Sequence, residues 1–110
     1  SAEMHNESSA AIKQRVLEAR ARQEYRYKGT SYQFNAELRP GDIKTYCKLD
    51  TETQAMMEEV FTRMNLSARA YHKIIKVART IADLDEKEDI LVGHLSEAIC
   101  YRMNDHKYWN

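Results

Sequence analysis

The sequence predicts an all-α protein, a compact bundle of four to five helices around one hydrophobic core. Its 110 residues include only three glycines and one proline, which is too few for the many turns of a β-sandwich or β-barrel. Apolar residues recur at helical spacing along several long segments. A chain of this length forms one domain, which we expect over residues 8–110. Residues 1–7 carry no apolar pattern, and we interpret them as a disordered leader or the remnant of a tag.

The first expected helix begins at a serine N-cap, either Ser8 or Ser9, and stops at Gly29. Its apolar stripe consists of Ile12, Val16, Ala19 and Tyr27. One flank of this stripe carries three arginines, Arg15, Arg22 and Arg26. Two interpretations remain open for them. Either they face solvent, with Glu18 supporting Arg22 at i, i+4, or they form a contact surface for a neighbouring subunit or for DNA.

Residues 30–49 interrupt the helical pattern. Pro40 suits the first position of a short helix that ends at Tyr46. Asp50 is the expected N-cap of the next helix. The apolar face of that helix consists of Met56, Met57, Val60 and Met64, which we interpret as adaptable core side chains.

Ser67 is the expected N-cap of the strongest predicted helix, which extends to Leu84. Its apolar face consists of Tyr71, Ile74, Ile75, Ala78, Ile81 and Ala82. The opposite, polar side consists of Arg69, His72, Lys76, Arg79 and Asp83. A final helix is expected to begin near Gly93. Its inward-facing residues should be Leu95, Ala98, Ile99 and Met103. Because the connecting loops are short, neighbouring helices should pack antiparallel.

The sequence contains no self-contained catalytic motif. It lacks the phosphate-binding pattern GxxxxGK[ST] and the dinucleotide-binding pattern GxGxxG. It also lacks the GxSxG and HExxH patterns of hydrolases and metalloproteases. The four histidines are scattered, so we expect them to be solvated and expect no metal site. The chain is therefore not expected to be an enzyme on its own.

The net charge and the cysteines indicate the cellular environment in which we expect the protein. The formal net charge is zero, so the whole molecule has no field that attracts it to nucleic acid or to an anionic membrane. Cys47 and Cys100 lack metal-ligand spacing, and we interpret both as reduced core thiols. No apolar run approaches the roughly 20 residues of a membrane span. We expect a cytoplasmic protein that does not enter a membrane.

Arg69 has an unusual position for an arginine. It follows the Ser67 N-cap by two residues, so it lies in the first turn of the longest apolar-faced helix. A cation at this end opposes the helix dipole, and an acidic residue would stabilise the helix better. Either Arg69 is an ordinary surface residue, or it meets an anion such as phosphate at a helix end that favours anions.

Four segments resemble one family in consistent order. The run LSARAYHKIIKVARTIADL, residues 66–84, resembles the C-terminal domain of Mg-chelatase-like AAA+ ATPases of the YifB/ComM type. The segments SSAAIKQRVLEARARQ, FNAELRPGDIKTYCKL and ILVGHLSEAICYRMNDHKYW are similar to further parts of that domain. The resemblance covers the chain from about Glu7 to its end. Departures are few: Lys13, Lys73 and Lys76 stand where the family often has arginine, and Val92-Gly93 replaces a proline-containing cap.

The resemblance implies a specific role. In such proteins a preceding ATPase core holds ATP and Mg, and the subunits assemble into rings, typically hexamers. The helical domain is the lid of that core. The Ser-Ala-Arg motif at 67–69 matches the family's sensor-2 position, so the resemblance assigns Arg69 to the γ-phosphate of ATP, in its own subunit or in the next. The expected supporting polar face consists of Ser67, His72, Lys73 and Lys76.

The resemblance extends to proteins that work on DNA branches, so DNA is an expected partner of the whole protein. It gives no porphyrin site and no metal-insertion site. The alternative hypothesis is a free-standing helical module that binds DNA or another subunit without contacting nucleotide. In that case the basic first helix would lie on the phosphate backbone, and DNA binding by this chain would weaken steeply with salt.

Overall fold

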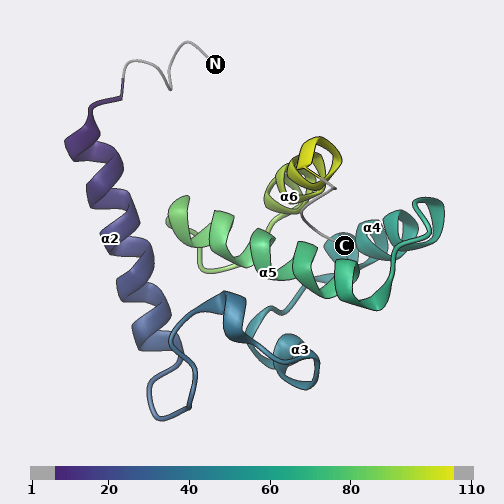
Figure 1. Ribbon diagram of the computed structural model, residues 1–110, viewed down its shortest axis with the longest axis horizontal. Coiled ribbons are helices and arrows are strands. Elements are labelled where there is room, and N and C mark those ends of the chain that lie inside the picture. The colour runs from purple at the N-terminus through teal and green to yellow at the C-terminus, as the bar shows by residue number, and fades with distance from the viewer. Residues whose placement is uncertain (1–6, 106–110) are drawn as a thin grey trace.

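The computed structural model describes residues 7–105, and within them the protein is all-α, as predicted (Figure 1). The α-helices are α2 (Ser9–Arg26), α3 (Ile43–Tyr46), α4 (Thr51–Arg63), α5 (Ala68–Leu84) and α6 (Val92–Asp105), with two 3₁₀ turns, η1 (Asn35–Glu37) and η2 (Pro40–Asp42), before α3. The only extended pairing among the described residues is an isolated bridge between Leu49 and Ile90. Residues 1–6 of the expected leader lie outside the described part of the chain.

The helix starts follow the predicted capping chemistry. The side chains of Ser8, Asp50 and Ser67 accept hydrogen bonds from the backbone N–H three residues later, at 3.1, 2.8 and 3.1 Å respectively. Each bond satisfies one of the backbone donors that the first helical turn leaves without a partner. α2 ends at Arg26, and the chain then turns through Gly29, whose φ of +83° favours glycine.

The core is organised around α5. Its apolar face buries Ala70, Ile74, Ile75, Ala78 and Ala82, and α6 adds Leu95 and Ala98. α5 lies in the middle of the molecule, with α2 at one end and α4 at the other (Figure 1). α2 runs across the direction of α5 rather than alongside it (Figure 1). The expectation of antiparallel packing concerned helices joined by short loops and does not cover this pair, which η1, η2, α3 and α4 separate in sequence.

Two apolar assignments near the ends of the fold are wrong. In α2, Ala19 and Tyr27 are buried as expected, but Ile12 and Val16 are exposed, because the first half of the helix extends beyond the rest of the molecule (Figure 1). In α6, Met103 is also exposed. Periodicity identifies the side of a helix that is apolar, but it does not show how far along the helix a neighbour covers that side.

Cysteine and histidine placement corrects two further expectations. Both cysteines are free thiols, but only Cys47 is in the core, whereas Cys100 is exposed. His94 is buried rather than solvated. Its Nδ1 accepts a hydrogen bond from the backbone N–H of Leu91 at 2.9 Å, and its Nε2 lies 2.8 Å from Asp85. His94 thereby satisfies a free donor at the start of α6, and its hydrogen bond lowers the pKa of Asp85.

Candidate functional site

Arg69 lies where the sequence places it, in the first turn of α5. Its side chain is exposed, and it makes no hydrogen bond or ion pair with any described residue. The first turn of α5 contains no acidic side chain that could compensate the charge. Ser67 caps the backbone N–H of Ala70 next to it. The start of α5 therefore combines a free guanidinium with the positive end of a long helix.

The expected supporting residues divide into different environments. His72 is half-buried, and its ring packs edge-on against Tyr71, with centroids 5.6 Å apart. Lys73 is half-buried one turn after Arg69. Lys76 has a structural task, because its Nζ donates to the carbonyls of Ala36 and Leu38 at 3.0 and 3.3 Å. These bonds fix the η1 segment against α5.

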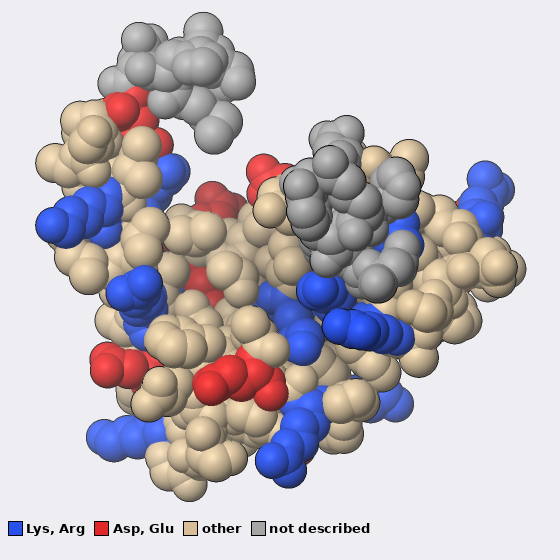
Figure 2. Space-filling model, in the orientation of Figure 1, with Lys and Arg blue, Asp and Glu red and all other residues tan. Residues whose placement is uncertain are grey.

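Burial lowers the pKa of Lys76, and Lys73 lowers it further. The residues expected to form one polar face therefore have different environments: Lys76 holds η1, His72 packs against Tyr71, and Arg69 is exposed. Figure 2 shows basic side chains gathered near the middle of the viewed face, where α5 runs. Among the expected set, Arg69 is the side chain whose charge is free to meet a ligand.

The arginines of α2 also separate. Arg15 is exposed and pairs with Glu7 at 2.8 Å. Arg22 lies 3.9 Å from Glu86, a distance typical of a weak surface pair. The expectation of a solvated flank is wrong for Arg26, whose side chain is only 18% exposed. Its guanidinium is engaged in an ion pair inside the protein, and the expected contact with a subunit or with DNA stays a prediction for all three arginines.

The partner of Arg26 is Asp83, which is fully buried near the end of α5. Two guanidinium nitrogens of Arg26 donate to the two carboxylate oxygens at 2.9 and 2.6 Å. The side-chain amide of Asn35 donates to the same carboxylate at 2.9 Å. The Asn35 carbonyl oxygen accepts from Tyr27 at 2.6 Å and from Arg26 at 3.1 Å. This network ties α2 and η1 to α5.

Arg79 completes the network from the same helix. Its Nη2 lies 3.3 Å from Asp83, and the guanidinium also donates to the carbonyls of Lys87 and Glu88 at 3.0 and 2.9 Å. Burial lowers the pKa of Arg79, and Asp83 opposes that effect. Arg79 and Asp83 were expected on the solvated side of α5, but they are 5% and 0% exposed. That expectation is wrong because α2 and the loop before α6 cover this end of the helix.

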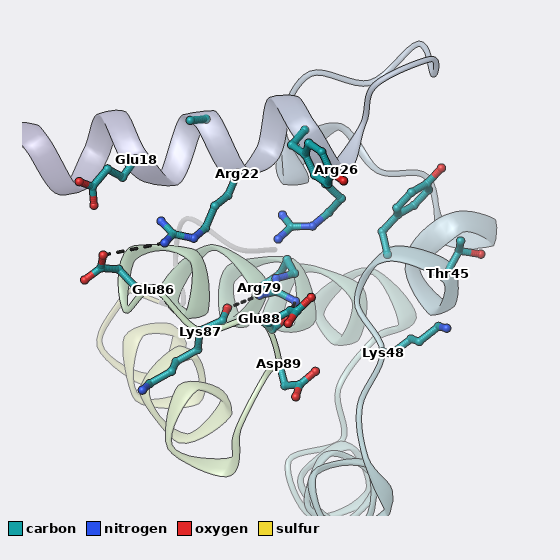
Figure 3. A pocket seen from close by; sticks show the side chains of 13 residues that line it. Glu18, Arg22, Arg26, Thr45, Lys48, Arg79, Glu86, Lys87, Glu88 and Asp89 are labelled. Atoms are coloured by element: carbon teal, nitrogen blue, oxygen red, sulfur yellow. Dashed lines mark hydrogen bonds and ion pairs between the residues drawn. The ribbon is translucent and has the colours of Figure 1, made fainter.

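A groove of 890 Å³ lies beside this network, between α2, the end of α3 and the loop before α6 (Figure 3). Arg22, Arg26 and Arg79 line it together with Lys48 and Lys87, and so do the acidic residues Glu18, Glu86, Glu88 and Asp89. Because both signs of charge are present in similar number, the groove does not select anions. Among the described residues, no group of three or more His, Cys, Asp or Glu could hold a metal ion. None of the described helices has the length and apolar character needed to cross a membrane.

The sequence that contains α5 and the residues around its two ends matches a known family. The family model for the C-terminal region of magnesium chelatase subunit ChlI matches residues 6–102. The chain belongs to this family. The matched residues include Arg69 with its capping serine and also the whole Asp83 network, so both features lie within the family domain.

Curated relatives agree with this assignment. The uncharacterized protein YifB of Escherichia coli (strain K12) is 43% identical over 99 residues, which cover 90% of this chain and 19% of the relative. The competence protein ComM of Haemophilus influenzae (strain ATCC 51907 / DSM 11121 / KW20 / Rd) is 40% identical over 96 residues, 87% of this chain and 18% of the relative. The chain therefore spans about a fifth of the length of the curated relatives it matches.

Proposed function

We propose that this ChlI C-terminal domain is the helical lid of an AAA+ ATPase and that Arg69 contacts the phosphates of ATP. The observation that carries the proposal is the free, exposed guanidinium in the first turn of α5. The family membership supports the same role, because the Ser-Ala-Arg motif at 67–69 matches the sensor-2 position in the resemblance described above.

The position of Arg69 in the first turn of α5 is unfavourable for the stability of the helix. A cation in the first helical turn opposes the helix dipole and lowers helix stability by a few tenths of a kcal/mol. Arg69 recovers none of this cost through contacts with the described residues. An anionic ligand at the same place would gain from the dipole, from free backbone N–H groups and from charge-assisted hydrogen bonds to the guanidinium. Phosphate fits all three, and the planar guanidinium can donate two hydrogen bonds to it.

The way in which α5 is held supports the proposed lid role. Arg69 lies at one end of α5, and Asp83, near the other end, is bonded to Arg26 of α2. A helix clamped in this way moves as a rigid unit with α2. Contact between Arg69 and a phosphate would thus shift the lid with the nucleotide state, which is how closing segments couple chemistry to motion. In this proposal ATP and Mg are held mainly by the ATPase core, and the subunits form a ring, typically a hexamer, that acts on DNA.

The test is ATP turnover by the longer protein that contains the core. Arg69→Ala is expected to reduce turnover sharply, by up to about 10³-fold, because phosphoryl transfer depends on charge neutralisation and positioning. Arg69→Lys should restore little, since an ammonium lacks the planar pair of donors. Arg63→Ala is the matched control, because Arg63 is an exposed arginine at the end of the preceding helix. Its turnover should stay near that of the unaltered protein.

Two outcomes would contradict the proposal. Undiminished turnover of a folded Arg69→Ala protein would remove Arg69 from the nucleotide site. Steeply salt-dependent binding of the 110-residue chain to DNA, together with undiminished turnover, would favour the alternative of a DNA-binding module. The DNA measurement uses a short duplex at rising salt concentration.

A further inference from the structure

The apolar stripe of α2 changes from buried to exposed partway along the helix. Ala19, Gln23 and Tyr27 are buried against the rest of the protein. One and two turns earlier on the same side, Val16 and Ile12 are 38% and 43% exposed. The spacing is continuous, because residues 12, 16, 19, 23 and 27 follow each other by three or four positions. The first half of α2 thus continues the interface side of the helix without a described partner.

The exposed half extends away from the body of the protein. Every residue from Ser8 to Leu17 is exposed, and Figure 1 shows this half of α2 at the left edge of the molecule, apart from α5 and α6. A helical segment of this length is marginal in water without tertiary contacts. Two large aliphatic side chains in line with a buried stripe are the pattern of a helix that packs against something along its whole length.

The charges beside the stripe indicate what kind of surface fits it. Lys13 and Arg20 lie on one flank of Ile12 and Val16, and Arg15 lies on the other. All three side chains are exposed. Glu18 is the only acidic residue in the second and third turns of α2. A complementary surface therefore has an apolar centre for Ile12 and Val16 with acidic side chains at its rim.

The length of the relatives indicates which partner would cover the exposed stripe of Ile12 and Val16. The relatives are about five times longer than the region they share with this chain, and the matching family describes the C-terminal part of its proteins. In a protein of this kind the remaining polypeptide joins the domain just before α2, next to the exposed stripe. Attachment within one polypeptide gives that region a high effective concentration near the stripe.

We propose that Ile12 and Val16 dock onto the preceding domain of the same polypeptide, at an apolar patch with an acidic rim. This inference rests on the proposed function, because it takes the chain to be the end of a longer ATPase. Docking there fixes the orientation of α2, and the Asp83 network then fixes α5 relative to α2. The two contacts together set where Arg69 lies relative to the core.

The experiment is hydrogen exchange of the amides of residues 9–17, measured by mass spectrometry in the 110-residue chain and in the longer protein. The longer protein should exchange these amides at least about tenfold more slowly. The pair Ile12→Asp and Val16→Asp should abolish the difference. Ile12 lies in the first turn of α2, where an added carboxylate is favourable. Val16 lies one turn later, so each variant is also measured in the 110-residue chain, and its protection in the longer protein is compared with that reference.

Leu17→Asp is the matched control. Leu17 is an exposed aliphatic residue on the same half of α2, at 49% exposure, but it lies on the side opposite the stripe. It should keep the protection of the longer protein. Equal exchange in the two lengths of protein would overturn the inference, and so would equal effects of Leu17→Asp and Ile12→Asp. Protection that appears in the 110-residue chain as its concentration rises would assign the stripe to a second copy and also overturn it. None of these exchange results depends on ATP turnover, so the proposed function can fail or hold separately.

Discussion

Arg69 and Arg79 belong to the same helix, and the sequence places both on its polar side, but their environments are opposite. Arg69 is exposed and makes no ion pair or hydrogen bond within the described part of the chain. Arg79 is buried and donates to Asp83 and to the carbonyls of Lys87 and Glu88. The local sequence of α5 does not show which of the two is buried, so the difference in burial comes from the neighbouring elements.

If the proposed function holds, stability and function are divided between the two ends of α5. Near the end of α5 the buried charges of Arg79 and Asp83 are paired, as is the partly buried Arg26, because unpaired buried charges cost several kcal/mol. At the start of α5 a charge is left without a partner, at a helix end where a cation lowers stability. The charge of Arg79 is paired inside the domain, whereas the nucleotide contact proposed for Arg69 needs a charge without a partner among the described residues.

The largest expected effect is loss of the buried carboxylate. Asp83→Ala should lower the free energy of unfolding by about 3–5 kcal/mol, because it leaves the guanidiniums of Arg26 and Arg79 close together without their shared partner. Urea unfolding of the 110-residue chain measures the change. Glu86→Ala is the control, since Glu86 is an exposed acid with one long ion pair, and its effect should stay within about 0.5 kcal/mol. A loss below about 1 kcal/mol for Asp83→Ala would mean that the network does not stabilise the fold.

Removing core volume should cost nearly as much. Ile74 is fully buried on the apolar face of α5, so Ile74→Ala should cost about 2–5 kcal/mol through lost burial and a cavity. Ile12→Ala removes the same atoms from an exposed position on α2 and should cost far less in the 110-residue chain. Similar losses at the two positions, measured by thermal unfolding, would contradict the assignment of core and surface.

Alkaline pH should act on the buried thiol. Burial raises the pKa of Cys47 from 9.0 to about 11. The folded protein keeps its proton where the unfolded chain loses it, so stability is full below pH 9 and falls as the pH rises toward 11. The loss should reach roughly 3 kcal/mol at most. Cys47→Ala should reduce this alkaline loss. Iodoacetamide at pH 8 should label Cys100 and spare Cys47 in the folded protein, and rapid labelling of Cys47 would contradict its burial.

Much of this architecture was predictable from the sequence because its determinants are local. Capping residues and apolar periodicity predicted the starts of α2, α4 and α5 and the apolar face of α5. The position of Arg69 in the first turn followed from the Ser67 N-cap alone. Local hydrogen bonds and helix geometry determine these features, so one segment contains the information for each.

The buried network was not predictable in the same way. Asp83 lies 57 positions from Arg26 and 48 from Asn35, and each of the three is compatible with a solvated surface when considered alone. One weak signal was available: Asp83 follows Arg79 by four residues, the spacing of a helical ion pair. Burial of that pair depends on how α2 crosses α5, which periodicity does not specify. The same reason explains why Ile12 and Met103 were wrongly assigned to the core and His94 to the surface.

The most direct measurement compares the two arginines by urea unfolding of the 110-residue chain. Arg69→Ala should change the free energy of unfolding by no more than about 0.5 kcal/mol, and a small gain is expected because a cation leaves the helix start. Arg79→Ala should cost at least about 1.5 kcal/mol, because the buried carboxylate and two carbonyls each lose a charged donor. Equal losses, or a larger loss for Arg69→Ala, would make Arg69 a structural residue and contradict the division of roles along α5.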